Sequence, residues 1–124
     1  MTPIDTPRAP AAIGPYSQAM RLGDTLYVSG QLPIDPETGE FAPGDAVAQA
    51  RQCLANIAAI AEAAGTDTSR TVKTTILLTD LADFAAINEE YGKAFSAPFP
   101  ARACYEVSAL PKGAMIEIEA VIAC

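Results

Sequence analysis

The sequence contains no histidine, the side chain that proteins use most often as a general base and as a metal ligand. Cysteine is scarce as well: Cys53, Cys104 and Cys124 are odd in number and show no C-x-x-C spacing. A disulfide framework and a zinc site are therefore both disfavoured. We expect a protein that binds no metal ion.

Positive charge is also in short supply. Eight lysine and arginine residues stand against fifteen aspartate and glutamate residues, which gives a net charge of −7. Such a surface repels phosphate backbones, and no clustered basic stripe offsets the repulsion. We therefore expect no nucleic-acid partner.

Long apolar runs are absent, although hydrophobic residues make up 50% of the chain. No run approaches the roughly 20 residues that span a bilayer. The start, MTPIDTPRAP, lacks the charged beginning and apolar core of a signal peptide. We expect a cytoplasmic protein without a membrane partner. Its 124 residues, free of linkers, repeats and low-complexity segments, fit one domain over 1–124.

The spacing of apolar residues predicts an α+β domain, with two helices on one face of a mixed sheet. Residues 1–14, rich in proline and alanine, are expected to be irregular. The predicted order after them is β-β-α-β-α-β-β: two strands around a turn at Gly23-Asp24, a helix from the cap Asp45 to Gly65, a strand over 71–79, a helix capped by Asp80, and strands at about 102–109 and 115–123.

The last strand, MIEIEAVIAC, carries apolar residues on both of its faces, interrupted only by Glu117 and Glu119. Two helices can cover one side of the sheet only, so the other side needs a different cover. Self-association would supply it. The alternative is that the N-terminal segment folds over this face.

Arg102 and Cys104 are the first candidates for chemistry. In PFPARACYEVSAL (98–110), strand alternation places Arg102, Cys104, Glu106 and Ser108 on one face. Arginine presents a planar fork of donors that matches a carboxylate or a phosphate. The thiol would stand about 6.5–7 Å away, across one small ligand. The alternative is that Arg102 pairs with a glutamate at a subunit contact while Cys104 fills space.

Polar residues in apolar surroundings supply further candidates. Glu117 lies between two isoleucines, where the pKa of a carboxyl group rises and the group can act as a base or an acid near neutrality. A solvated charge at the rim of the fold is the alternative. Asn88 shares a helix face with apolar residues and needs a polar partner or a ligand. Ser29-Gly30, at a strand end, and Tyr16, in IGPYSQ, are also candidates for a pocket.

Several segments of the chain resemble the reactive-intermediate deaminase (RidA-type) family, also labelled L-PSP endoribonucleases or enamine/imine deaminases. The resemblance covers about residues 9–123 in the segments IGPYSQA, LYVSGQLPIDPETGE, QARQCLANI with EAAG, VKTTILLTDLADFAAINEEY, and FPARACYEVSALPKGAMIEIEAVIA. The last segment is specific, because Pro-Ala-Arg, a cysteine two residues on, and Ile-Glu-Ile after LPKGA occur at the family's spacing. The connection from Asn88 to FPAR is shorter than in the best-known bacterial members, so substrate breadth stays open.

The resemblance implies a chorismate-mutase-like fold, a homotrimer, and three clefts between neighbouring subunits. Arg102 would grip the substrate carboxylate, with Cys104 and Glu117 at the reacting carbon. The site residues implied are Arg102, Glu117 and Cys104 for catalysis, and Tyr16, Ser29, Gly30, Asn88 and again Arg102 for substrate binding.

The implied activity is hydrolytic deamination of short 2-enamino and 2-imino acids (2-aminoacrylate/2-iminopropanoate, 2-iminobutanoate) to 2-oxo acids and ammonia, without a metal or an organic cofactor. We expect no covalent role for Cys104, because no histidine or lysine lies near it in sequence to form a thiolate. The alternative is a non-catalytic module that binds small carboxylates or acts as a chaperone. An endoribonuclease or translation inhibitor is a third option, disfavoured by the acidic charge.

Overall fold

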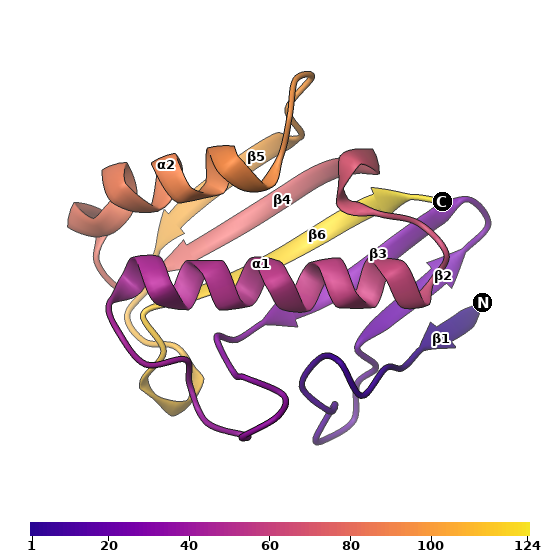
Figure 1. The fold of residues 1–124 in the computed structure, drawn as a ribbon, viewed down its shortest axis with the longest axis horizontal. Helices are drawn as coiled ribbons and strands as arrows, with labels where there is room; N and C mark the ends of the chain where they lie inside the picture. Colours follow the sequence, from indigo (N-terminus) through magenta and orange to yellow (C-terminus); the bar gives the residue numbers. More distant parts are fainter.

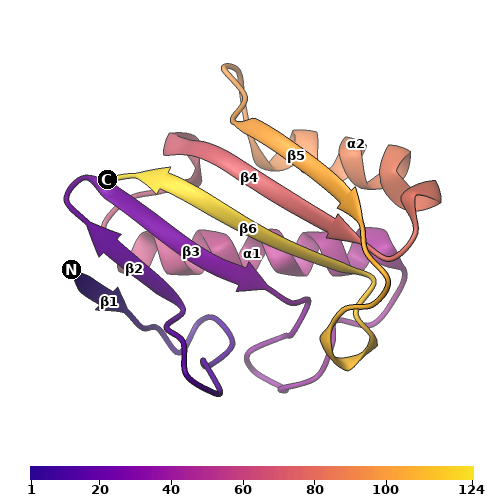
Figure 2. The same ribbon diagram turned by 180° about the vertical axis from the view of Figure 1, so that it is seen from behind.

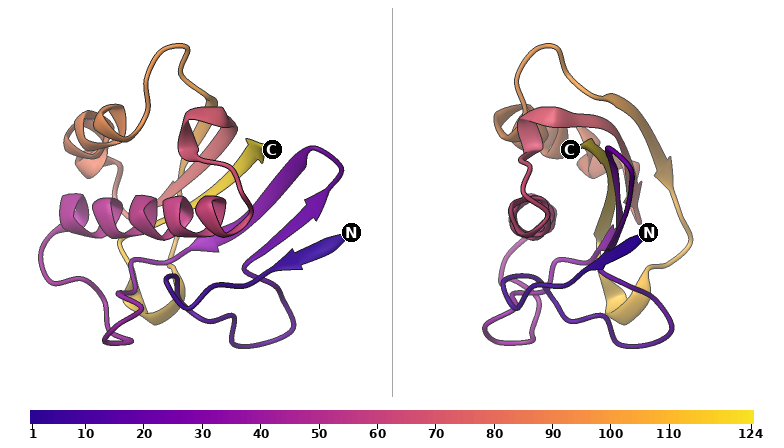
Figure 3. Two further views of the ribbon diagram at one scale, coloured as in Figure 1. Left: turned by 45° about the vertical axis from the view of Figure 1, so that its right-hand side comes forward. Right: turned by 90° about the vertical axis from the view of Figure 1, so that its right-hand side faces the viewer.

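A computed structural model describes all of residues 1–124, and Figure 1 shows one mixed sheet with two helices in front of it. The six strands lie in the order β1-β2-β3-β6-β4-β5. The elements are β1 (Thr2–Ile4), β2 (Ala19–Leu22), β3 (Thr25–Gln31), α1 (Ala46–Ala63), β4 (Thr71–Leu78), α2 (Phe84–Ala94), β5 (Ala101–Glu106), β6 (Ile116–Ala123), and the 3-10 turns η1 (Thr68–Arg70), η2 (Leu81–Asp83) and η3 (Pro111–Gly113). The right-hand view of Figure 3, nearly edge-on to the sheet, shows both helices on one side of it, which confirms the predicted α+β class.

Helix α1 forms where the apolar spacing predicts it. The Asp45 side chain accepts a hydrogen bond from the Ala48 N–H at 3.1 Å, which satisfies one of the free donors of the first turn. Gly65, just beyond the helix, has a φ of 80°, a conformation that glycine adopts at little cost. Ile57 and Ile60 are fully buried in the core cluster. No helix of the structure is both long enough and apolar enough to cross a membrane.

Strand β6 runs through the middle of the sheet and shows how the two faces differ. Ile116, Ile118 and Ile122 are completely buried, whereas Glu117 and Glu119 alternate with them and point to the face without helices. Strands β3 and β4 flank β6 in antiparallel orientation, while β4 and β5 run parallel. A parallel pair needs a crossover connection, and α2 provides it.

Three expectations from the sequence are wrong in detail. The first residues are not wholly irregular, because β1 pairs with β2 at the edge of the sheet, where Pro3 is tolerated. Asp80 caps η2 through the Ala82 N–H rather than capping α2, which begins at Phe84. Strand β5 ends at Glu106, so Ser108 lies beyond the strand face on which it was expected.

The face of the sheet without helices is left open, as Figure 2 shows. Tyr27 on β3 is 50% exposed and Tyr105 on β5 is 58% exposed. The N-terminal segment therefore leaves these two side chains uncovered, and cover by self-association stays a prediction.

Candidate active site

Arg102 projects from the edge strand β5 toward α2. Its Nη1 donates a hydrogen bond to Oδ1 of Asn88 at 2.6 Å. The guanidinium carbon lies 5.3 Å from the centre of the Phe84 ring and 4.9 Å from that of Tyr91, within the range of cation–π attraction. The three ion pairs of the chain do not include Arg102, so no carboxylate of the same chain neutralises it. The expected polar partner of Asn88 is thus the guanidinium itself.

The Tyr91 ring, which contacts Arg102, is itself fixed by two neighbouring side chains. The Tyr91 hydroxyl shares a hydrogen bond of 2.6 Å with the Thr74 hydroxyl, and both side chains are buried. The Phe95 ring packs on Tyr91 with the two ring centres 4.7 Å apart. A buried tyrosine with a hydrogen-bonded hydroxyl has little freedom to move. Its ring and the Asn88 side chain therefore favour one orientation of the Arg102 guanidinium.

A hollow beside Arg102 is lined by Asn88, Tyr91, Gly92, Phe99 and Pro100 as well as by the arginine. Phe99 is 57% exposed, although it is a large apolar side chain. Sequence reasoning did not single it out. Its position three residues before the arginine, in FPAR, was the available signal.

Cys104 lies two residues along β5 on the same face as Arg102 and packs against the core. Burial raises the pKa of its thiol, and the charge of Arg102 offsets this only in part. A raised pKa disfavours the thiolate, which is the reactive form of cysteine, and the absence of a covalent role for Cys104 stays a prediction.

Glu117 lies in a separate cleft on the other face, between the N-terminal segment, the end of β3 and the turn η3. Tyr16, Gly30 and Lys112 line this cleft with it. Burial raises the pKa of the Glu117 carboxyl group, and repulsion from Glu119 adds to the effect. No ion pair engages this carboxylate. A carboxyl group in this state can take up and release a proton closer to neutrality than a solvated one.

Gly30 sits in a β-bulge, where Ser29 and Gly30 together oppose the single residue Glu119. A Cβ atom at position 30 would overlap the Glu117 carboxylate, since it would lie 2.7 Å from Cδ. The glycine therefore allows the Glu117 carboxylate to lie close to the backbone of this strand. Ser29 donates its hydroxyl to the Ser17 carbonyl at 2.6 Å and so ties the segment that carries Tyr16 to β3.

The position of that segment depends on Gln18, which sequence reasoning missed. Gln18 is 2% exposed, and its amide bonds to the backbone of Thr6, Ala9 and Pro10. A buried amide satisfied in this way fixes the path of the N-terminal segment along the cleft. The only available signal was a glutamine next to a predicted strand.

The predicted site residues thus form two groups on opposite faces of one sheet. Thr74 pairs with both Arg102 and Ala120, and Ala120 is buried beneath the helices. Leu77 pairs with both Tyr105 and Glu117, on the open face. Because directly paired residues of neighbouring strands share a face, Arg102 and Glu117 cannot meet within one chain. One group is Arg102, Asn88 and Cys104, and the other is Tyr16, Ser29, Gly30 and Glu117.

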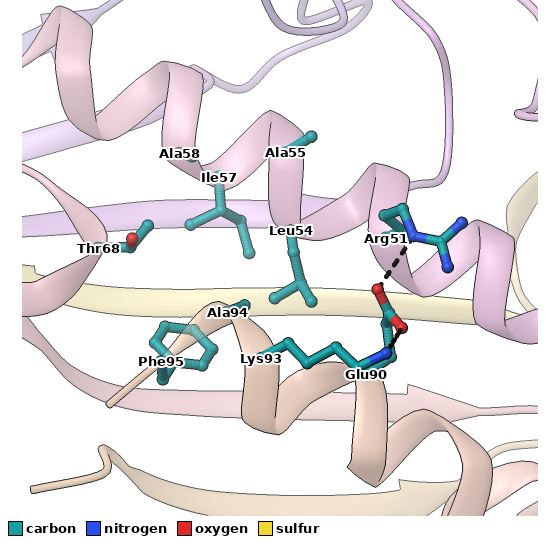
Figure 4. A pocket seen from close by; sticks show the side chains of 10 residues that line it. All are labelled: Arg51, Leu54, Ala55, Ile57, Ala58, Thr68, Glu90, Lys93, Ala94 and Phe95. Carbon is teal, nitrogen blue, oxygen red and sulfur yellow. Dashed lines mark hydrogen bonds and ion pairs between the residues drawn. The ribbon is translucent and has the colours of Figure 1, made fainter. Parts of the chain in front are cut away.

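A further groove lies between the two helices and contains none of these residues. Figure 4 shows Leu54 and Ile57 of α1 facing Phe95 and Ala94, with Glu90 of α2 between two cations. Glu90 binds Arg51 at 3.0 Å and Lys93 at 3.3 Å, and these partners lower the pKa of its carboxyl group. The groove is the seam where α1 and α2 pack, closed by an ion-pair network.

Comparisons with known sequences point to one family. The chain matches the family described as Endoribonuclease L-PSP over residues 6–124. The RutC family protein y4sK of Sinorhizobium fredii is 70% identical, over 97% of this chain and 95% of that protein. The human protein named 2-iminobutanoate/2-iminopropanoate deaminase is 52% identical, over 95% of this chain and 86% of its own length.

Solved structures agree with the sequence matches. RidA from the Antarctic bacterium Psychrobacter sp. PAMC 21119 superposes with a TM-score of 0.96, at 50% identity over the whole of both chains. E. coli TdcF with bound serine superposes with a TM-score of 0.94, at 43% identity over 100% of this chain and 99% of that one. The six-stranded sheet with two helices on one face is the chorismate-mutase-like α+β fold. The chain belongs to the Endoribonuclease L-PSP family, which is also called the RidA family.

Proposed function

We propose that this protein hydrolyses short 2-imino acids, such as 2-iminopropanoate and 2-iminobutanoate, to 2-oxo acids and ammonia. The observation that carries the proposal is the Arg102 guanidinium, which is fixed by Asn88, Phe84 and Tyr91 and has no acidic partner. A cation held in this way is suited to bind the carboxylate of a small molecule. The human relative named for this reaction supports the choice of substrate.

The proposed assembly is a homotrimer whose sites form between neighbouring copies. Arg102 and Glu117 lie on opposite faces of one sheet, so one site can contain both only if two copies contribute. The open face, with Tyr27 and Tyr105 exposed, offers the apolar surface that such an assembly would bury. In each cleft, Arg102, Asn88 and Cys104 of one protomer would face Tyr16, Ser29, Gly30 and Glu117 of the next.

In this cleft the protonated imine carries an electrophilic carbon next to its carboxylate. Arg102 would bind the carboxylate, and Glu117 would take a proton from a water molecule as its oxygen bonds to the imine carbon. Glu117 would then return that proton to the nitrogen of the tetrahedral intermediate. As the carbon–nitrogen bond breaks, the hydroxyl of the intermediate would become the carbonyl group, and its proton would pass through Glu117 to the departing ammonia. One water is consumed, and the products are a 2-oxo acid and ammonium. Cys104 would line the pocket without bonding to the substrate.

A non-catalytic binding module is the alternative, since a relative in this family has been crystallised with bound serine, which also carries a carboxylate. The same Arg102 group would serve either role. The description endoribonuclease, which the family carries, has less support here, because a chain with a net charge of −7 and no histidine is poorly suited to RNA.

The test generates an imine from a 2-amino acid with an amino-acid oxidase and follows the appearance of 2-oxo acid with and without the protein. We expect Arg102→Ala to abolish the acceleration. Arg21→Ala is the matched control, because Arg21 bonds to backbone carbonyls at the far end of the sheet. Binding of 2-oxobutanoate without any acceleration of hydrolysis would contradict the proposed activity and favour the alternative, a non-catalytic binding module.

Mixing two inactive variants tests the shared site. If Arg102→Ala and Glu117→Gln subunits exchange at random, a site with both residues intact should form about a quarter of the time, so activity should return to about that fraction. If each site lay within one chain, the mixture would stay inactive.

A further inference from the structure

Lys112 is the one non-glycine residue of the chain with a positive φ, at 59°, with a ψ of 19°. This left-handed conformation costs a residue with a Cβ atom roughly 1–2 kcal/mol, and glycine or asparagine is the usual occupant. The next residue, Gly113, also has a positive φ, of 73°. A lysine in such a position points to a use for its side chain there, because strained residues gather at functional sites.

The side chain of Lys112 belongs to the cleft that contains Glu117, together with Tyr16 and Gly30. Six of the eight basic residues of the chain make a side-chain hydrogen bond or ion pair: Arg8, Arg21, Arg51, Arg70, Lys93 and Arg102. Lys112 and Lys73 are the other two, and only Lys112 lines this cleft. In a chain of net charge −7, an unpaired cation at a cleft is a specific feature.

We propose that Lys112 binds a second carboxylate, so that the protein also accepts 2-imino acids with an acidic side chain. This inference rests on the proposed function, in which Arg102 holds the carboxylate next to the imine and Glu117 stands at the imine carbon. The side chain of the substrate then extends along the cleft that Glu117 shares with Lys112. A dianion is repelled by an acidic protein unless a local cation receives its second charge. The oxidation of an acidic 2-amino acid supplies such an imine.

A simple ion pair with Glu117 would be another use for Lys112, but two observations argue against it. No ion pair joins the two side chains. The pKa of the Glu117 carboxyl group is raised by burial and by Glu119, whereas a neighbouring ammonium group would lower it. Lys112 is therefore free to pair with a ligand.

The experiment measures kcat/KM for two imines, one made from alanine and one from aspartate, each by the appropriate oxidase. In Lys112→Asn, which suits the left-handed backbone, we expect a loss of roughly tenfold for the aspartate-derived imine, as for a lost charged hydrogen bond. For the alanine-derived imine we expect a change of no more than about twofold. Lys112→Arg should keep both activities. Lys93→Asn, on α2 and outside this cleft, is the control for removing a positive charge.

A binding measurement separates this inference from the proposed function. Titration calorimetry with 2-oxoglutarate and with 2-oxobutanoate should show a selective loss of 2-oxoglutarate affinity in Lys112→Asn, even if no imine is hydrolysed. A wild-type protein that accelerates hydrolysis of the alanine-derived imine but neither hydrolyses the aspartate-derived one nor binds 2-oxoglutarate would overturn the inference alone. Equal losses for both classes of ligand would also overturn it.

Discussion

Replacing Gly30 with alanine tests how the glutamate of the cleft is positioned. The added Cβ atom would lie 2.7 Å from Cδ and 3.2 Å from Cγ of Glu117. Carbon atoms in contact prefer about 3.5–4.0 Å, so the carboxylate must move by roughly 0.8 Å or more. Because Glu117 is only partly buried, the side chain can turn away, and the expected loss of stability is about 1–2 kcal/mol.

The effect of Gly30→Ala on rate should be much larger than its effect on stability. Displacement of a catalytic group by about 1 Å can lower a rate by about a hundredfold. The assay is imine hydrolysis under saturating conditions, with 2-oxobutanoate affinity measured in parallel. We expect kcat to fall by about that factor while the affinity, which depends on Arg102, changes little.

Two comparisons make the Gly30 result interpretable. Glu117→Asp withdraws the carboxylate by one methylene, so Gly30→Ala should destabilise that background much less than the wild type, as a double-mutant cycle in urea would show. Gly92→Ala adds the same methyl group where no atom lies within 4 Å apart from its chain neighbours and the backbone of its own helix, and it should stabilise α2 by about 0.5–1 kcal/mol. A Gly30→Ala protein with wild-type rate and wild-type stability would refute the reasoning.

Four further predictions rest on contacts described above. Activity should rise with pH as Glu117 loses its proton, with the midpoint above the usual carboxyl range because burial raises this pKa, and Glu117→Gln should remove the rise. Since a raised pKa means that the folded state holds the proton more tightly than the unfolded chain, Glu117 favours folding at low pH and this contribution is lost as pH rises through the folded pKa. Glu117→Gln should therefore be more stable than the wild type in urea at pH 7, by a margin that disappears near pH 4. Thr74→Val removes the partner of the Tyr91 hydroxyl and should cost about 1–3 kcal/mol in urea unfolding and weaken 2-oxo acid binding; unchanged binding would mean that the ring does not orient Arg102. Lys112→Gly should raise the free energy of unfolding by up to about 1 kcal/mol, and a drop would show that the turn is not strained.

Most of the fold could be predicted from the sequence because its signals are local. The apolar spacing and the cap at Asp45 determine α1, and the turn at Gly23-Asp24 joins β2 to β3 as expected. The strand β1 was missed because three residues that include Pro3 carry no periodic pattern, and only pairing with β2 makes them a strand. The start of α2 was misplaced because Asp80 can cap either an α-helix or a 3-10 turn. The sequence carries no separate signature for the η2 turn that Asp80 caps.

The candidate site was predictable in its residue types but not in its geometry. The sequence identified Asn88 as a polar group in need of a partner, and the structure supplies Arg102. The placement of Arg102 and Glu117 on opposite faces depends on the register of β4 with both of its neighbours, which no local pattern encodes. The close approach of Gly30 to Glu117 depends on a bulge, and the conformation of Lys112 depends on a turn, so neither could be seen in advance.

The parallel pairing of β4 with β5 has a consequence for how the molecule can change over time. Every side chain that orients the guanidinium, from Thr74 to Arg102, comes from one uninterrupted strand–helix–strand stretch of 71–106. The glutamate and the residues around it come from the two ends of the chain. Mutations that alter how Arg102 binds a carboxylate can therefore accumulate in the middle of the gene while Glu117 and the residues around it stay unchanged.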